Sequence, residues 1–284
     1  MIKITRKNFR KYETAAVVTG AASGMGRLYA RKLALAGYNV VAVDINAEKL
    51  AEAAGEIAAE IAALGDFRAE YKASFRMLQV VQDLSENDAA QKIYAASEGL
   101  TVDVLVNNAG IMYCAAIADT SPRALSLMMM LHCHTPLMLC RMFVPDMIRR
   151  GRGRILNISS LAAWMIWPAI GMYGNTKRFV KGFSRSLRIE CRGTGVSVTN
   201  AYFGAVDTPM IPLKPSLRKL ARNIAVMIDA DKATDKALKA LFKGRKGTMP
   251  GLLNKIFLPV CAILPDAVLA WLLRKLGPYV LMKV

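Results

Sequence analysis

The sequence predicts an α/β protein in which a doubly wound parallel sheet forms a single domain. Three observations support this fold class. Short β-branched runs alternate with longer helical patterns, a glycine cluster follows the first run, and 54% of the 284 residues are hydrophobic. Each crossover must carry the chain back over the sheet, so strands that alternate with helices pair in parallel and are covered on both faces.

The predicted elements follow one another along residues 14–201. The first strand, Thr14–Thr19, ends at the glycine cluster, and the first helix, Gly26–Ala36, ends before Gly37, because glycine commonly terminates helices. Periodicities of two and of 3.6 residues indicate the other strands and helices. The later predicted strands are Asn39–Val43, Met77–Val81, Val102–Val106, Arg154–Ile158 and Val196–Ala201, and the later helices are Ala47–Leu64, Glu86–Glu98, Arg123–Arg149 and Ala169–Arg192.

Basic segments precede and follow the predicted core of residues 14–212. Residues 1–13 form a basic extension without the apolar stretch of a secretory signal, which favours a cytoplasmic protein. Residues 213–284 lose the strand alternation and predict a substrate lid and an apolar, basic helical appendage of the same domain. Within it, Ala267–Leu276 with Trp271 predicts a helix that either lies in a membrane interface or packs on a subunit.

The charge and the cysteines restrict the partners. Lys and Arg number 39 against 21 Asp and Glu, a formal charge of +18, so the surface attracts polyanions. No nucleic-acid-binding motif accompanies the charge, which leaves peripheral association with anionic membrane as the expectation and excludes nucleic acid. The five cysteines show no C-x-x-C pair or metal-ligand spacing, so reduced thiols and no metal site are predicted.

The segment TGAASGMG, residues 19–26, predicts a dinucleotide-binding loop. Glycines between a strand and a helix let a pyrophosphate approach the positive end of that helix. Asp44 ends the second predicted strand, where its carboxylate can bind a ribose diol and repel a 2′-phosphate, so NAD(H) is preferred over NADP(H). The residues of the loop predicted to contact the cofactor are Thr19, Gly20, Ser23, Gly24, Met25 and Gly26.

Tyr173 and Lys177 form the predicted chemical centre. Hydride transfer to a carbonyl needs a proton donor at the developing alkoxide, and a tyrosine can supply that proton. The ordinary phenol pKa of about 10 is high for this task, so a cation is needed to favour phenolate. Lys177 lies four residues after Tyr173, on the same helical face, and can provide the charge.

These motifs together resemble those of the short-chain dehydrogenase/reductase family. Residues 19–26 resemble its TGxxxGxG loop, Asn107-Asn108-Ala109-Gly110 its NNAG segment, and Tyr173-Gly174-Asn175-Thr176-Lys177 its YxxxK pair. The resemblance covers roughly residues 14–210 and implies a seven-stranded Rossmann sheet that assembles into dimers or tetramers. It also implies that Ser160, rather than Ser159, orients the substrate oxygen and that Lys177 contacts the nicotinamide ribose. The further cofactor contacts that it implies are Asp83, Leu84, Asn107, Ala109, Gly110, Tyr173, Val206 and Thr208.

Two positions depart from the family pattern. His132 stands where the family has an asparagine that supports a proton relay, and Tyr202-Phe203-Gly204 replaces its Pro-Gly. A neutral histidine can donate and accept, so His132 can either continue the relay, with a charge that varies near neutral pH, or simply pack in the core. His134 is expected to be a buried, hydrogen-bonded histidine. Residues two apart on a helix point to different faces, so His132 and His134 are not expected to bind one metal ion.

The predicted function is therefore an NAD(H)-dependent oxidoreductase of a hydrophobic alcohol or ketone, of the hydroxysteroid or long-chain acyl type. The apolar segment Trp164–Pro168, with Tyr113 and Cys114, predicts either a substrate pocket or a subunit interface. The alternative function is a catalytically impaired NAD-binding regulatory or scaffold protein, because a fold alone does not fix function.

Overall fold

The computed structural model describes residues 14–65, 69–164, 170–208, 219, 227–250 and 264–280. The basic N-terminal extension, residues 1–13, lies outside the described residues, as do residues 66–68, 165–169, 209–218, 220–226, 251–263 and 281–284. The main strands are β1 (Thr14–Thr19), β2 (Asn39–Asp44), β3 (Met77–Val81), β4 (Thr101–Asn107), β5 (Gly153–Ser160), β6 (Val196–Phe203) and β9 (Gly247–Thr248). The helices include α1 (Gly24–Leu35), α2 (Ala47–Ala62), α3 (Ala69–Ser74), α4 (Ala89–Ala96), α5 (Pro122–Met129), α6 (Thr135–Arg149), α7 (Gly171–Glu190), α9 (Ala230–Phe242) and α11 (Asp266–Val280).

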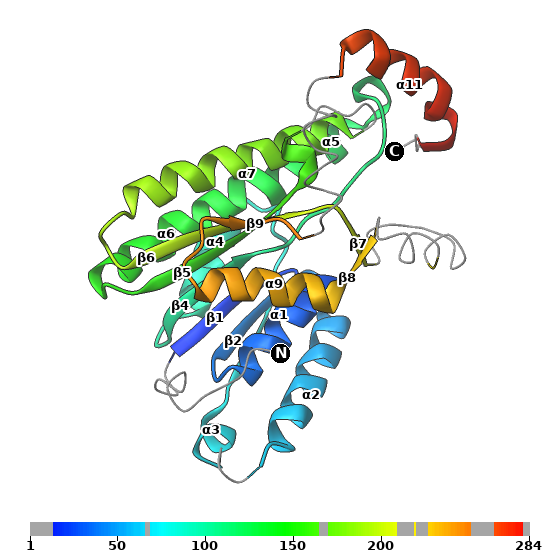
Figure 1. The fold of residues 1–284 in the computed structure, drawn as a ribbon. Helices are drawn as coiled ribbons and strands as arrows, with labels where there is room; N and C mark the ends of the chain where they lie inside the picture. The colour runs from blue at the N-terminus through cyan, green and yellow to red at the C-terminus, as the bar shows by residue number, and fades with distance from the viewer. Residues whose placement is uncertain are drawn as a thin grey trace.

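One seven-stranded parallel sheet forms the centre of the molecule, in the order β3-β2-β1-β4-β5-β6-β9 (Figure 1). The strand order reverses between β1 and β4, so the connections leave these two neighbours in opposite directions. A crevice opens at such a switch point, outside the carboxyl ends of the strands. The predicted doubly wound fold, a Rossmann sheet, is therefore confirmed.

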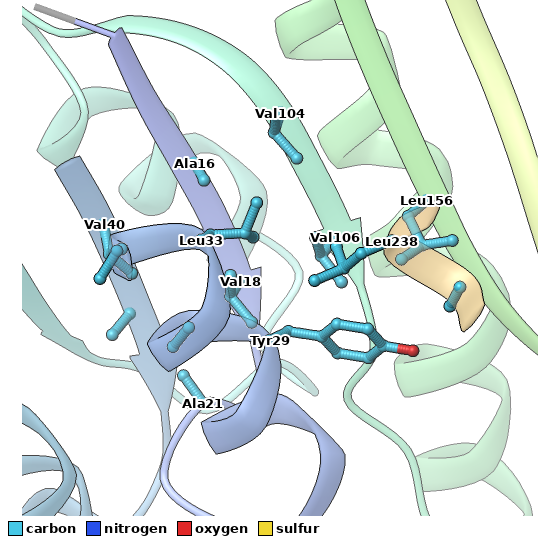
Figure 2. Packing of buried hydrophobic residues seen from close by; sticks show 14 of the residues in the cluster. Ala16, Val18, Ala21, Tyr29, Leu33, Val40, Val104, Val106, Leu156 and Leu238 are labelled. Carbon is cyan, nitrogen blue, oxygen red and sulfur yellow. The ribbon is translucent and has the colours of Figure 1, made fainter. Parts of the chain in front are cut away.

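Alternate residues of each strand supply two separate cores. Ala16 and Val18 of β1 join one cluster with side chains of α1, α2 and α9, whereas Ala15 and Val17 join another with side chains of α4, α6 and α7. Figure 2 shows the first cluster, in which Tyr29 and Leu33 of α1 lie over the strands. Both sheet faces are thus covered, as near-continuous apolar strands require.

The predicted helix Arg123–Arg149 is interrupted. Between α5 and α6, residues Met130–His134 form one turn of π-helix. Pro136 has no N–H to donate to the carbonyl of His132, four residues earlier, which removes one α-helical hydrogen bond. The stretch Pro122–Arg149 is long and apolar enough to cross a membrane by length and composition, and its residues Leu139, Phe143 and Met147 pack in the core on the sheet.

The chain beyond Pro212 was predicted to be helical, and this interpretation is wrong in two places. The short strand β8 (Met227–Asp229) pairs with β7 (Ala205–Asp207), and β9 completes the main sheet beside β6. Between them, α9 packs on α1, and Lys32 of α1 forms ion pairs with Asp231 and Asp235 of α9 at 2.9 and 2.7 Å. These strands contain only two or three residues, too few to produce a visible sequence periodicity.

Candidate cofactor and active site

A cavity of about 990 Å³ opens at the carboxyl ends of the strands. Most residues predicted from the sequence line it, although they come from segments far apart in the chain. Its walls include the β1–α1 loop, the ends of β2, β4 and β5, and the first turns of α7. The predicted residues that line this cavity are Gly20, Ser23, Gly24, Met25, Asp44, Asp83, Leu84, Ala109, Gly110, His132, Ser160, Tyr173, Lys177, Val206 and Thr208.

The glycines of the β1–α1 loop are required by its backbone. Gly20 and Gly24 have φ values of 69° and 53°, in the left-handed region where other residues are strained. A Cβ atom on Gly26 would overlap the carbonyl oxygen of Gly20. Ser23 precedes α1 without a side-chain cap, and the first turn of α1 contains no acidic residue. The positive end of this helix therefore faces the cavity and fits a pyrophosphate.

Asp44 lies at the cavity wall next to this loop. Its Oδ2 accepts a hydrogen bond from the Ala22 amide and its Oδ1 accepts one from the Asn46 amide, both at 3.0 Å. These bonds fix the carboxylate while leaving lone pairs for further donors. The geometry suits a ribose diol and would oppose a 2′-phosphate.

Three predicted cofactor contacts do not line the cavity. Thr19 instead fastens the NNAG segment, because its Oγ1 accepts from the amides of Asn108 and Ala109 at 3.0 and 3.1 Å. Gly26 lets α1 approach Gly20. Asn107 is buried and donates to the Asn157 Oδ1 at 2.8 Å. These three residues therefore stabilise the segments that line the cavity without lining it themselves.

Ser160, Tyr173 and Lys177 meet on one side of the cavity. Ser160 and Tyr173 both line the cavity, and the Ser160 Oγ accepts a hydrogen bond from the Ala162 amide at 3.2 Å. Lys177 Nζ lies 5.6 Å from the centre of the Tyr173 ring and donates to the Ile158 carbonyl at 3.2 Å. Ser159 points elsewhere, since its Oγ donates to the Lys177 carbonyl at 3.0 Å.

Burial controls the protonation of this group. Burial lowers the pKa of Lys177 to about 8, and it raises the pKa of Tyr173 although the neighbouring Ser160 hydroxyl acts in the opposite direction. The effect of Lys177 on the acidity of this phenol stays a prediction, because burial dominates the net upward shift of the Tyr173 pKa. Tyr173 is a protonated phenol near neutral pH, which is the form that donates a proton.

His132 connects the two sides of the cavity through what we call the His132 bridge. The Ile111 amide donates to His132 Nε2 at 3.1 Å, Nδ1 lies 2.8 Å from Thr176 Oγ1, and that hydroxyl donates to the Tyr173 carbonyl at 2.7 Å. Because Nε2 accepts, the neutral ring carries its hydrogen on Nδ1 and donates it to Thr176. A Cβ on Gly110 would lie 2.6 Å from Nε2, so glycine is needed there.

The charge of His132 does not vary near neutral pH, contrary to the expectation from sequence. The side chain is buried, and desolvation together with the charge of Lys177 holds the pKa of His132 well below its ordinary value. His134 is half-buried, and its Nε2 has no partner among the described residues. No group of three or more His, Cys, Asp or Glu side chains with metal-binding geometry occurs in that part of the chain.

Apolar side chains line the part of the cavity beyond Tyr173. They come from the segment after the NNAG motif, from α5 and the π-turn, and from the segment before α7. Trp164 does not line the cavity, because its ring packs on Tyr202 at 5.5 Å between centroids. Residues 165–168 lie outside the described residues. The apolar residues of this wall are Ile111, Met112, Leu127, Met130, Leu131, Leu161 and Ile170.

Asn108 and Thr176 are two of the residues that the sequence interpretation missed although they take part in the hydrogen bonds at the site. Asn108 lines the cavity and its amide donates to the Thr19 carbonyl at 3.0 Å. Its place in the NNAG motif was a signal that could have identified it. Thr176 belongs to the His132 bridge but occupies a variable position of the YxxxK pattern, so no sequence signal singled it out.

Comparison with known proteins agrees with this geometry. Residues 14–216 match the short chain dehydrogenase family. The chain is 35% identical to a very-long-chain 3-oxoacyl-CoA reductase of Anas platyrhynchos over 72% of this chain and 64% of that protein. It is 33% identical to a 17-beta-hydroxysteroid dehydrogenase type 3 of Danio rerio over 69% and 61%, respectively. The chain thus spans less than two thirds of these curated relatives.

Two solved structures are similar to the chain over 96% and 85% of its length, respectively. A structure from work on 7beta-hydroxysteroid dehydrogenase stereoselectivity superimposes with a TM-score of 0.77 at 26% identity, covering 96% of this chain and 98% of the other. A metagenomic short-chain oxidoreductase in complex with NADP has a TM-score of 0.65 at 28% identity, covering 85% and 99%. The match of residues 14–216, together with these similarities, shows that the chain belongs to the short-chain dehydrogenase family.

Proposed function

We propose that the chain is an NAD(H)-dependent oxidoreductase that interconverts a hydroxyl and a carbonyl group on a hydrophobic substrate. The observation that carries this proposal is that Ser160, Tyr173 and Lys177 line one cavity together, with Lys177 Nζ 5.6 Å from the centre of the Tyr173 ring. This arrangement provides a proton donor, a second hydroxyl to hold the substrate oxygen, and a cation next to both.

Tyr173, Ser160 and Lys177 have different roles in the proposed reaction. Nicotinamide supplies or accepts the hydride when it is bound. In the direction of reduction, the phenol of Tyr173 donates its proton to the developing alkoxide, while the hydroxyl of Ser160 holds that oxygen. Lys177 stabilises the phenolate that this transfer leaves on Tyr173. Oxidation uses the same groups in reverse, and Tyr173 then accepts the proton.

The cofactor preference that we propose rests on Asp44. Its carboxylate is held at the cavity wall by the Ala22 and Asn46 amides, and no basic side chain occupies the loop residues 19–26. A 2′-phosphate would meet a negative charge without a compensating cation from the loop, so NAD(H) should bind more tightly than NADP(H).

The substrate class follows from the apolar wall beyond Tyr173. Side chains such as Met112, Met130 and Ile170 offer few polar partners, which suits a steroid or a long-chain acyl derivative. The names of the relatives, a 3-oxoacyl-CoA reductase and a hydroxysteroid dehydrogenase, support the same two classes. A panel of hydrophobic alcohols and ketones, followed at the nicotinamide absorbance with NAD(H) and NADP(H), tests this proposal. Absence of turnover with every member, while NAD(H) binds, would favour a regulatory NAD-binding protein instead.

The proposed partners are a second copy of the chain and an anionic membrane. Apolar side chains are exposed on α6 and α7, including Leu137, Ile148 and Phe179, which favours a dimer or tetramer. On α11, Trp271 is 52% and Val268 39% exposed, one turn apart and followed by the exposed Arg274 and Lys275. Such a helix suits a membrane interface. Replacing Trp271 and Val268 with alanine should weaken binding to anionic vesicles without changing the oligomer, and the reverse result would make α11 a packing element.

A further inference from the structure

A stripe of positive charge runs along α7, away from the cavity. We call it the α7 ridge, and it consists of Arg178, Lys181, Arg185, Arg188 and Arg192. The spacing of alternately three and four residues keeps these side chains on one face of the helix and its C-terminal continuation. Over fourteen residues the stripe is about 21 Å long at 1.5 Å per residue.

The α7 ridge has no acidic partner among the described residues. None of its members takes part in an ion pair there, whereas Arg27, Arg31 and Lys32 of α1 all do. Arg188 donates instead to the carbonyls of Val198 and Lys246 at 2.9 and 2.8 Å, and Arg178 donates to that of Ala163 at 3.4 Å. A neutral carbonyl orients a guanidinium but leaves its charge uncompensated.

The charges of the ridge repel one another. Burial and the neighbouring Arg178 and Arg185 together lower the pKa of Lys181, and burial together with Arg185 lowers that of Arg188. Adjacent turns of a helix are closer than the Debye length of about 8 Å at physiological ionic strength, so salt screens this repulsion only in part. A polyanionic surface would relieve it.

The ridge continues beyond α7 and includes an aromatic side chain. Arg188 reaches the Arg245–Lys246 turn before β9, which adds two exposed cations. Lys181 Nζ lies 3.2 Å from the centre of the Trp164 ring, which is itself 37% exposed. An indole beside cations is typical of proteins that lie at the boundary between lipid headgroups and water.

The ridge lies on a different side of α7 from Phe179, which is exposed, and Phe183, which is partly buried. Phe183 packs on the core shared by α4, α6 and α7 and stacks with Phe179, whereas Arg188 reaches toward β6 and β9. The proposed subunit contact through the apolar side would therefore leave the ridge accessible.

We infer that the α7 ridge, with the Arg245–Lys246 turn and Trp164, is a docking surface for an anionic lipid bilayer. This surface is separate from α11 and does not depend on the catalytic proposal. The occupant follows from charge complementarity and from the exposed indole. Each cation at an anionic membrane surface strengthens binding about fivefold, so several together give a measurable affinity.

The test compares two triple variants of the full chain. Arg178→Gln/Arg185→Gln/Arg192→Gln removes the three exposed members of the ridge. The control Lys236→Gln/Lys239→Gln/Lys243→Gln removes the same charge from exposed positions on and just after α9, against the opposite sheet face. Binding is measured by co-sedimentation with vesicles of phosphatidylcholine alone and with phosphatidylserine added, at low and physiological salt, and circular dichroism checks the fold.

The expected result is that the unmodified chain binds only the vesicles that contain phosphatidylserine. The ridge variant should lose on the order of a hundredfold in affinity, and the control should stay within about fivefold. Equal losses in both variants would reduce the effect to net charge and overturn the inference. It would also be wrong if the ridge variant loses affinity for a DNA duplex but not for vesicles, or if only its oligomeric state changes by light scattering.

Discussion

The β1–α1 loop and the His132 bridge border the same cavity, but they are built by different means. The loop is a property of backbone conformation, since Gly20 and Gly24 adopt positive φ angles and Gly26 leaves room for the turn. The His132 bridge is a chain of side-chain hydrogen bonds that joins the Ile111 amide to Thr176 and the start of α7. The first is determined within eight residues, and the second depends on three segments meeting in space.

This difference predicts different responses to substitution. A loop whose backbone conformation requires glycine does not tolerate an added Cβ atom, because no side chain can rearrange to make room. A side-chain network tolerates a substitute that offers a donor and an acceptor in the same place.

Gly26→Ala should lower the affinity for NAD(H) by at least about a hundredfold, or about 2.8 kcal/mol. The added Cβ overlaps the Gly20 carbonyl oxygen, so the loop must open and the α1 terminus moves away from the pyrophosphate. Calorimetric titration with NADH measures this effect. The control is Gly55→Ala on α2, where a Cβ meets nothing within 4 Å, and it should stabilise the fold by up to about 1 kcal/mol without changing the affinity. Normal binding by Gly26→Ala would show that the loop is not under this constraint.

His132→Ala should reduce kcat by roughly ten- to a hundredfold, because a buried amide without a partner costs about 1–3 kcal/mol and Tyr173 loses a positioning contact. His132→Asn should restore much of the rate, since an amide side chain both donates and accepts. The pH profile provides the discriminating measurement. The low pKa of His132 keeps the ring neutral, so kcat/KM of the unmodified enzyme should show no ionisation near pH 6.5 that the Asn variant lacks. Such an ionisation would mean that His132 itself carries the proton.

Asp44→Ala should weaken NAD(H) binding about tenfold and bring the affinity for NADP(H) close to it. A hydrogen bond to a charged group contributes about 1.5–3 kcal/mol, and the repulsion of a 2′-phosphate disappears with the carboxylate. Titration of both cofactors gives the ratio. Asp44→Asn separates the two effects, because it keeps an acceptor and removes the charge. Equal affinities of the unmodified protein for NAD(H) and NADP(H) would contradict the assignment.

Lys177→Met should change how stability depends on pH, with an effect of a few degrees in Tm. Burial lowers the pKa of Lys177 to about 8 from 10.5, so above pH 8 the folded chain has released a proton that the unfolded chain still binds. The contribution of Lys177 to the free energy of unfolding therefore rises between pH 8 and pH 10. In thermal unfolding, the Met variant should have a higher Tm than the unmodified protein at pH 7, and this difference should disappear at pH 10. A difference that is constant with pH would mean that Lys177 titrates normally.

The sequence predicted most of the fold because its signals are local. Strand β1 was predicted with the observed bounds, and the order of motifs from Thr19 to Lys177 implied the seven-stranded sheet. The strands β8 and β9 were missed because they contain two or three residues and owe their pairing to distant neighbours. The π-turn Met130–His134 was missed since a helical periodicity does not reveal one additional residue in a turn.

The sequence predicted most residues of the site, but it predicted their hydrogen bonds and pKa shifts less well. Thr19 and Asn107 do not line the cavity, and they form hydrogen bonds with the NNAG segment and with Asn157, so their predicted contact with the cofactor stays a prediction. The directions of the pKa shifts of Tyr173 and His132 were not accessible, because they depend on burial by residues from several segments. Thr176 acquires its role only from the position of His132 in space.

The central claim is that Tyr173 delivers the proton in a site that binds NAD(H) independently of it. Single-turnover reduction of the best ketone from the panel, followed by NADH absorbance in Tyr173→Phe and in the unmodified enzyme, tests this claim most directly. The phenylalanine keeps the ring and removes only the phenol hydroxyl that donates the proton, so the rate should fall at least about a thousandfold while the Kd for NADH stays within about threefold. A variant that retains more than about a tenth of the rate would contradict the account.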